Sequence, residues 1–328
     1  MPDDAGGLEH LLADREVKTQ RLILQRLIQC HAVALSPHNK SKLEGLLSLL
    51  LNRVQSLAPP DGDSDIKHES LDACIWGLFL VSREIPTHAA AEAISLIVHL
   101  EQRLADGVSS PDGPDWPTGG ELLALRTLPL LFPTSDAAHP VATPLTLLLA
   151  HFAASCPVRS LGDAAAALFV VAELRACTEP AARVAPEVPT LLAALLVSAL
   201  PQAAQDTLGS THGGKALLEQ WTLFSTEEDG DPMALLRGAV AAVAGKERGV
   251  EALRLAAVLS GDLEGEDAAR QTLLSALQLA TAVVKGSKAV ADSLPGAEVA
   301  VAVMLQPLAT ASFLLSKALA GGGGGKEK

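Results

Sequence analysis

Residues 121–157, ELLALRTLPLLFPTSDAAHPVATPLTLLLAHFAASCP, contain two apolar segments separated by a short polar break. The first segment ends where Pro133 removes a backbone donor and Thr134, Ser135 and Asp136 can satisfy free amides. The second begins at Thr143-Pro144, a capping residue followed by a proline that opens helices, and ends near residues 156–157. This stretch therefore predicts a helix, a tight corner and a second helix.

Helix-breaking and capping residues recur along the whole chain, where Pro, Gly and Asp separate segments with helical periodicity. In the first segment Val17, Leu24, Ile28 and Leu35 fall on one stripe by the 3.6-residue period. Thr87 is a predicted cap for the segment that opens at Pro86. The predicted helices are 11–35, 37–57, 67–85, 86–104, 121–131, 143–156, 161–177, 181–200, 233–244, 247–259, 267–284 and 298–319.

Composition supports an all-α class. Apolar residues make up 48% of the 328-residue chain, yet there are only 6 Phe, 3 Trp and no Tyr. The apolar fraction is mostly Ala, Leu and Val, and Ala and Leu are strong helix formers, whereas aromatic and β-branched residues favour strands. This composition excludes an all-β fold, intrinsic disorder and a reader of single-stranded nucleic acid that relies on aromatic stacking.

The helices pair with a period of roughly 35–45 residues, which is typical of a HEAT-like or irregular α-solenoid with about twelve helices in antiparallel pairs. No consensus repeat is legible, so a compact, irregular helical domain stays open as the alternative. The predicted organisation is N-terminal helical repeats of about four helices (1–105), a loop (106–120), helical repeats carrying the corner (121–200), a flexible linker (201–232), C-terminal helices (233–320) and a disordered tail (321–328).

Charge is unevenly distributed along the chain. The net charge is −13, but residues 1–60 carry seven basic and six acidic side chains, for +1, whereas residues 61–200 carry −10 and residues 201–328 carry −4. A protein that grips nucleic acid over its whole surface should be basic. Arg15, Lys18 and Arg26 lie within about a quarter-turn of one another on the first predicted helix. They form either a solvated face or a contact with an acidic partner or RNA phosphate.

No catalytic constellation is recognisable in the sequence. The nine histidines are scattered, the four cysteines form no C-x-x-C pair, and neither a G-x-S-x-G elbow nor a phosphate-binding glycine loop is present. We therefore expect no enzymatic activity, no cofactor and no metal site. The acidic, polar opening MPDDAGGLEH is no secretory signal, so we expect a soluble intracellular chain. Val299–Ser316 carries no charge, and we expect a buried core helix there rather than a membrane span.

The corner resembles a known signature. Residues 132–144 are similar to the FPTSD-x-x-HPV-x-TP motif of the nucleolar protein 14 family, and the resemblance continues through 156–160, 162–169 and 183–187. Upstream, residues 28–31 and 38–44 are similar to a turn between two helices of that family, so the resemblance covers about residues 10–200. The residues that form this signature corner are Phe132, Pro133, Thr134, Ser135, Asp136, His139, Pro140, Thr143 and Pro144.

The resemblance implies a non-catalytic scaffold of the nucleus and nucleolus that supports small-subunit rRNA maturation within the small-subunit processome. It implies two protein partners, a nucleolar-complex HEAT-like protein and a pseudouridine-specific rRNA methyltransferase, with pre-rRNA and snoRNA contacted indirectly or weakly, and no membrane. Members of the family are long and have a charged N-terminal half. This chain looks like a C-terminal part of such a protein or a shortened relative.

Two questions remain open from the sequence. The corner is either structural, with His139 bridging two helix ends by hydrogen bonds, or a partner-contact loop, because exposed loops on a rigid scaffold often carry binding. The function is either ribosomal assembly or that of a generic α-solenoid adaptor, for example in transport or trafficking. A helical ligand-binding or hydrolytic domain is a third class, for which the sequence offers no residues.

Overall fold

The computed structural model describes residues 1–2, 4–59, 68–111, 113–135, 138–200, 255–261, 263–293 and 297–321, together with a few isolated residues between 205 and 253. Within these ranges the chain forms α-helices, two short 3-10 helices and no strand. The prediction of an all-α protein is confirmed. The predicted linker 201–232, the helix predicted at 233–244, the tail beyond Gly321 and Asp136 of the corner lie wholly or largely outside the described residues.

Most predicted helices recur with small shifts of their ends. The α-helices are α1 (Ala5–Leu12), α2 (Val17–Cys30), α3 (Asn39–Ser56), α4 (His68–Glu84), α5 (Pro86–Val108), α6 (Gly119–Leu131), α7 (Ala142–Ser155), α8 (Leu161–Thr178), α9 (Glu187–Ser198), α13 (Leu255–Ser260), α14 (Gly265–Ser293) and α15 (Ala297–Gly321), and the 3-10 helices are η1 (Val33–Leu35) and η2 (Glu179–Ala181).

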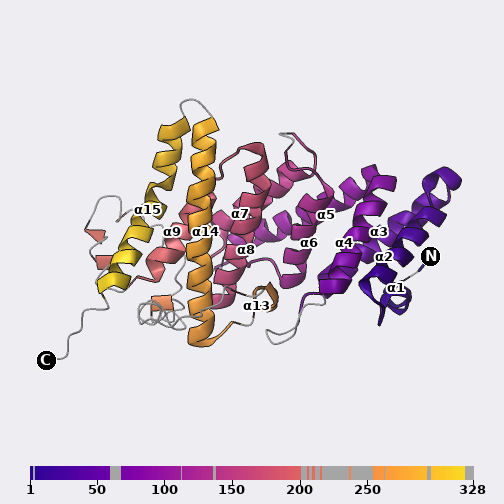
Figure 1. The fold of residues 1–328 in the computed structure, drawn as a ribbon, viewed down its shortest axis with the longest axis horizontal. Helices are drawn as coiled ribbons and strands as arrows, with labels where there is room; N and C mark the ends of the chain where they lie inside the picture. Colours follow the sequence, from indigo (N-terminus) through magenta and orange to yellow (C-terminus); the bar gives the residue numbers. More distant parts are fainter. Residues whose placement is uncertain are drawn as a thin grey trace.

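The helices stand side by side in an elongated row, with α1 to α4 near one end and α14 and α15 near the other (Figure 1). One apolar cluster runs through the row, from Leu8 in α1 to Leu315 in α15. Packing does not follow the chain strictly: α2 and α3 both pack on α4, α6 packs on α3 and α4, and the α14–α15 hairpin packs on α8 and α9. The arrangement of the helices as HEAT-like antiparallel pairs of sequence neighbours stays a prediction.

The predicted helix 11–35 is divided in the structure, and this is a correction. Helix α1 ends at Leu12, α2 begins at Val17, and the turn between them passes through Asp14 with φ 53°. Asp adopts this left-handed conformation more readily than most residues, so the break needs neither Gly nor Pro. Leu24 and Ile28 of the predicted stripe are buried, whereas Leu35 is 68% exposed.

The starts of two helices also differ from the sequence pattern. Helix α5 begins at Pro86 after the N-cap residue Ile85, so Thr87 lies inside the first turn instead of capping it. Helix α6 begins two residues before its predicted start, because Thr118 and Glu121 form a capping box. The Glu121 carboxylate also accepts from Arg103 at 2.5 Å, which connects the start of α6 to α5.

Helix α15 is less buried than its sequence predicts. Val301, Leu308 and Leu315 form a buried stripe, and α15 packs on α9 and α14. Val299, Val303 and Phe313 are 64–73% exposed. The window Glu298–Leu315 has a mean hydropathy of 1.6 and is long and apolar enough to cross a membrane by length and composition, with 22% of it buried. A helix apolar on all sides carries no sequence signal for which face packs.

Candidate partner-binding site at the two ends of helix α6

The signature corner connects the end of α6 to the start of α7. The Phe132 N–H donates to the Leu128 carbonyl at 2.9 Å and closes the last turn of α6. Helix α7 then begins at Ala142. Pro133, Ser135 and Pro140 are exposed, whereas Phe132 and His139 are half-buried. The corner therefore presents prolines and a hydroxyl to solvent and keeps its two rings partly inside.

His139 contacts both the start of α7 and the end of α6, but through different kinds of interaction. Its Nδ1 accepts hydrogen bonds from the backbone N–H groups of Val141 and Ala142, at 3.2 Å each. At the other end its ring lies 5.8 Å from the Phe132 ring at an interplanar angle of 48°. Because Nδ1 accepts, this arrangement requires the neutral imidazole with its proton on Nε2. His139 thus caps α7 by hydrogen bonds and meets the α6 end by a ring contact.

The sequence assigns the start of α7 to a different pair of residues. Thr143 and Pro144, predicted as the cap and the first helical residue, lie within the first turn, because the helix begins at Ala142. The Thr143 N–H donates to the His139 carbonyl at 3.2 Å. Histidine caps are not part of the usual Ser, Thr, Asp or Asn pattern, so no sequence signal predicts that the His139 ring takes this role.

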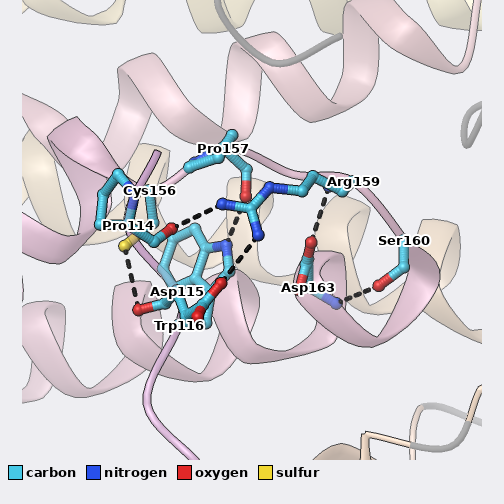
Figure 2. A network of polar contacts seen from close by, with 8 residues as sticks. All are labelled: Pro114, Asp115, Trp116, Cys156, Pro157, Arg159, Ser160 and Asp163. Atoms are coloured by element: carbon cyan, nitrogen blue, oxygen red, sulfur yellow. Dashed lines mark hydrogen bonds and ion pairs between the residues drawn. The ribbon is translucent and has the colours of Figure 1, made fainter. Parts of the chain in front are cut away.

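At the opposite end of α6, residues 113–118 meet the turn between α7 and α8 (Figure 2). Trp116 is 7% exposed, and its Nε1–H donates to the Pro157 carbonyl at 2.8 Å. The Cys156 thiol contacts the Asp115 carbonyl at 3.6 Å. Gly113 has φ 74°, and a Cβ there would lie 3.3 Å from the Pro157 ring, so this position requires glycine.

Arg159 ties the two loops together from the α7–α8 side. Its Nη1 contacts the Asp115 carboxylate at 2.8 Å and its Nη2 donates to the Pro114 carbonyl at 2.9 Å (Figure 2). Ser160 caps α8 by accepting from the Asp163 N–H at 3.0 Å, and Asp163 in turn accepts from the Arg159 N–H at 2.7 Å. The planar guanidinium therefore holds one carboxylate and one carbonyl at once.

Burial at this junction makes its thiol unreactive. Burial raises the pKa of the Cys156 thiol to about 12, and the nearby Arg159 charge offsets this only in part. Burial also raises the pKa of Cys177 to about 12, with the Glu173 charge adding to the effect. The thiolate is the reactive form of cysteine, so these two side chains pack as small apolar groups rather than acting as nucleophiles.

A cavity of about 360 Å³ opens beside this junction, and α13 forms its far wall. Its lining includes Asp115, Thr118, Asp163 and Ser260. The α13 backbone comes so close that a Cβ on Gly119 would collide with the Leu259 carbonyl. A Cβ on Gly162 would collide in the same way with the Gly261 carbonyl. Two glycines thus let α13 sit directly on the starts of α6 and α8.

The predicted basic residues lie elsewhere. Arg15 is in the turn before α2, and Lys18 and Arg26 are on α2, so only two of the three share a helix. All three side chains are exposed. Helix α2 belongs to the N-terminal end of the row, and the α6–α7 corner lies in its middle (Figure 1). The structure does not bring the basic residues and the signature corner together.

Sequence reasoning missed the Trp116 junction. Residues 106–120 contain many prolines and glycines and were predicted to form a loop or tether, yet Trp116 and Arg159 fix residues 114–116 to the α7–α8 turn. The available signal was a tryptophan in an otherwise polar loop, since tryptophan is highly buried on average. Among the described residues, no group of three or more His, Cys, Asp or Glu side chains could hold a metal ion.

Comparison with known proteins connects this chain to one family. The sequence profile of the Nop14-like family matches residues 1–319. The chain is 28% identical over 239 residues to nucleolar protein 14 of Mus musculus and 30% identical over 220 residues to nucleolar protein 14 of Homo sapiens. These matches cover 73% and 66% of this chain, and 27% and 25% of the relatives.

A probable nucleolar complex protein 14 of Schizosaccharomyces pombe is 26% identical over 218 residues, which cover 66% of this chain and 26% of that protein. The chain therefore spans about a quarter of the length of the curated relatives it matches.

Proposed function

The chain belongs to the Nop14-like family, and we propose that it is a non-catalytic scaffold in small ribosomal subunit biogenesis. In this role it holds assembly factors together within the small-subunit processome and supports maturation of the small-subunit rRNA without a reaction of its own. The observation that carries the proposal is the family match over residues 1–319. The names of the mouse, human and fission yeast relatives indicate the nucleolus as the place of action.

The shape and chemistry of the described helices support a scaffold. The row of helices offers a long surface for partners, as an irregular HEAT-like solenoid does (Figure 1). The thiols of Cys156 and Cys177, whose pKa burial raises to about 12, are protonated, and the polar groups of the Trp116 junction bond to one another. These side chains hold the fold together and are not arranged around a reacting group.

The exposed face of α15 supports a helical protein partner. Helix α15 exposes Val299 and Val303 on the side opposite its buried stripe, and these valines are 73% and 64% exposed. We assign this face to the HEAT-like partner of the nucleolar complex, because another helix would bury these valines as α9 buries the opposite side. The rRNA methyltransferase is the second proposed partner, and pre-rRNA and snoRNA are contacted indirectly or weakly.

Co-purification tests this function. The tagged chain, expressed in cells of its own organism, should recover the HEAT-like protein, the methyltransferase and small-subunit rRNA precursors. Val299→Glu with Val303→Glu should release the HEAT-like protein, whereas Val98→Glu on α5, at a valine that is 59% exposed, should not. Recovery of transport or coat factors without pre-rRNA would instead support a generic α-solenoid adaptor and overturn the proposal.

A further inference from the structure

Helices α2 and α4 carry an unusual arrangement of planar side chains at the N-terminal end of the row. On α4 the rings of Trp76 and Phe79 stack, with centroids 6.0 Å apart and an interplanar angle of 25°. The Arg21 guanidinium of α2 lies 5.7 Å from the Trp76 ring centroid. The Arg83 guanidinium lies 5.6 Å from the Phe79 ring centroid. Four planar groups from two helices therefore form one continuous stack.

This stack lies on the surface of the protein. Trp76 is 37% exposed, although tryptophan is usually among the more buried residues. On α2 the residues Lys18, Leu22 and Arg26 follow one another at four-residue spacing, which places them on one outer face. Leu22 is 46% exposed. We call the seven residues of both helices the α2–α4 surface: Lys18, Arg21, Leu22, Arg26, Trp76, Phe79 and Arg83.

The composition of the α2–α4 surface is that of a protein interface. Apolar anchors with a charged rim are the common anatomy of such interfaces, and tryptophan and arginine dominate their binding energy. Here Trp76 and Leu22 supply the apolar contact, and arginines and a lysine surround them. Arg21 also holds the Asp72 carboxylate at 2.5 Å, so the surface already binds one carboxylate from within the chain.

We propose that the α2–α4 surface binds an acidic, amphipathic segment of a partner protein. Helix α2 contributes three basic side chains and no acidic one, in a chain whose net charge is −13. A segment rich in Asp and Glu is therefore repelled by most of the molecule and attracted here. Its carboxylates pair with Lys18 and Arg26, and its apolar side chains cover Leu22 and Trp76.

The stack favours a protein segment over single-stranded RNA. A base stacks on an open aromatic face, and both rings here already have a guanidinium over one face. The exposed Leu22 side chain cannot bind phosphate, and the four basic side chains of this surface, which lie beside the acidic Asp72, supply few phosphate contacts. This inference goes beyond the assembly role proposed above and does not depend on it, because the α2–α4 surface and α15 lie near opposite ends of the row (Figure 1).

Fluorescence anisotropy of labelled peptides tests the proposal on the intact chain. The probe is a short helical peptide of glutamate and leucine, and its counterpart has lysine at every glutamate position. The glutamate peptide should bind, and Lys18→Glu with Arg26→Glu should weaken it at least about tenfold, because like charges then face each other. The same double variant should bind the lysine peptide more tightly than the wild type does.

Two controls separate this surface from general charge and from misfolding. Lys40→Glu with Lys42→Glu reverses two exposed charges on α3 and should leave both peptides unaffected. Trp76→Ala should weaken the glutamate peptide, with the far-UV circular dichroism spectrum unchanged. The proposal would be overturned if the α3 variant lost as much affinity for the glutamate peptide as the α2 variant does. It would also be overturned if the α2 variant did not come to prefer the lysine peptide over the glutamate peptide. An oligouridylate that displaces the peptide and binds the wild type more tightly would overturn it as well.

Discussion

Replacing Trp116 by phenylalanine isolates the hydrogen bond that holds residues 113–118 against the α7–α8 turn. Phenylalanine keeps an aromatic ring in the site but cannot donate to the Pro157 carbonyl, 2.8 Å from Nε1 in the wild type. Pro157 is buried, so water does not replace the lost donor. A buried acceptor left without a partner costs about 1–3 kcal/mol. The smaller ring adds to this cost, because part of the indole volume is left unfilled.

The expected fall in the free energy of unfolding is therefore at least ~1–3 kcal/mol, which lowers Tm by a few degrees in a protein of this size. Urea unfolding followed by far-UV circular dichroism measures it. Trp76→Phe is the matched control, because Trp76 is 37% exposed and phenylalanine only weakens a contact with Arg21 that is worth about 0.5–1 kcal/mol in full. If Trp116→Phe is no more destabilising than Trp76→Phe, the indole hydrogen bond does not fix the loop.

Three further changes test other parts of the structure. His139→Ala should cost about 1 kcal/mol, the value of a lost cap, in thermal unfolding; an unchanged Tm with loss of a co-purifying partner would make the corner a contact loop. Gly162→Ala should lower Tm because its Cβ meets the Gly261 carbonyl, whereas Gly45→Ala, with nothing within 4 Å, should raise it. Burial raises the pKa of Glu173 above its ordinary 4.5, although the Arg126 charge offsets part of the effect. In urea unfolding, the stability of the wild type relative to Glu173→Gln should therefore fall as the pH rises from the unfolded-state pKa through the raised folded-state pKa, and a difference that does not change with pH would contradict this.

The helices were largely predictable because their signals are local. Ser160 caps α8 and Pro86 opens α5, and both residues stand where a helix is expected to begin from sequence alone. Composition was sufficient for the all-α class, since a chain rich in Ala and Leu and poor in aromatic residues has little material for strands. The exposed side chains Lys18 and Arg26 also follow from helical periodicity.

The contacts between distant segments were not predictable, because each depends on packing. Trp116 contacts Pro157, which lies 41 residues further along the chain. Arg21 contacts Trp76 on another helix, and helical periodicity relates only residues of the same helix. The low aromatic content argues against a reader of single-stranded nucleic acid that relies on aromatic stacking, but it does not predict that Trp76 and Phe79 lie three residues apart on one helix face. The count of a residue type says nothing about whether its few members are neighbours.

The backbone contacts that α13 and the following Gly261 make with Gly119 and Gly162 have a consequence for the order of folding. Helices α1 to α8 pack on helices close to them in sequence, so each can find its place soon after it leaves the ribosome. Helix α13 packs on α6 and α8, and α14 and α15 pack on α8 and α9, so all three meet helices that are synthesised long before them. During synthesis the starts of α6 and α8 therefore lack their contact with α13 until residues 255–260 have been made. A chaperone that shields exposed surface is most needed in this interval.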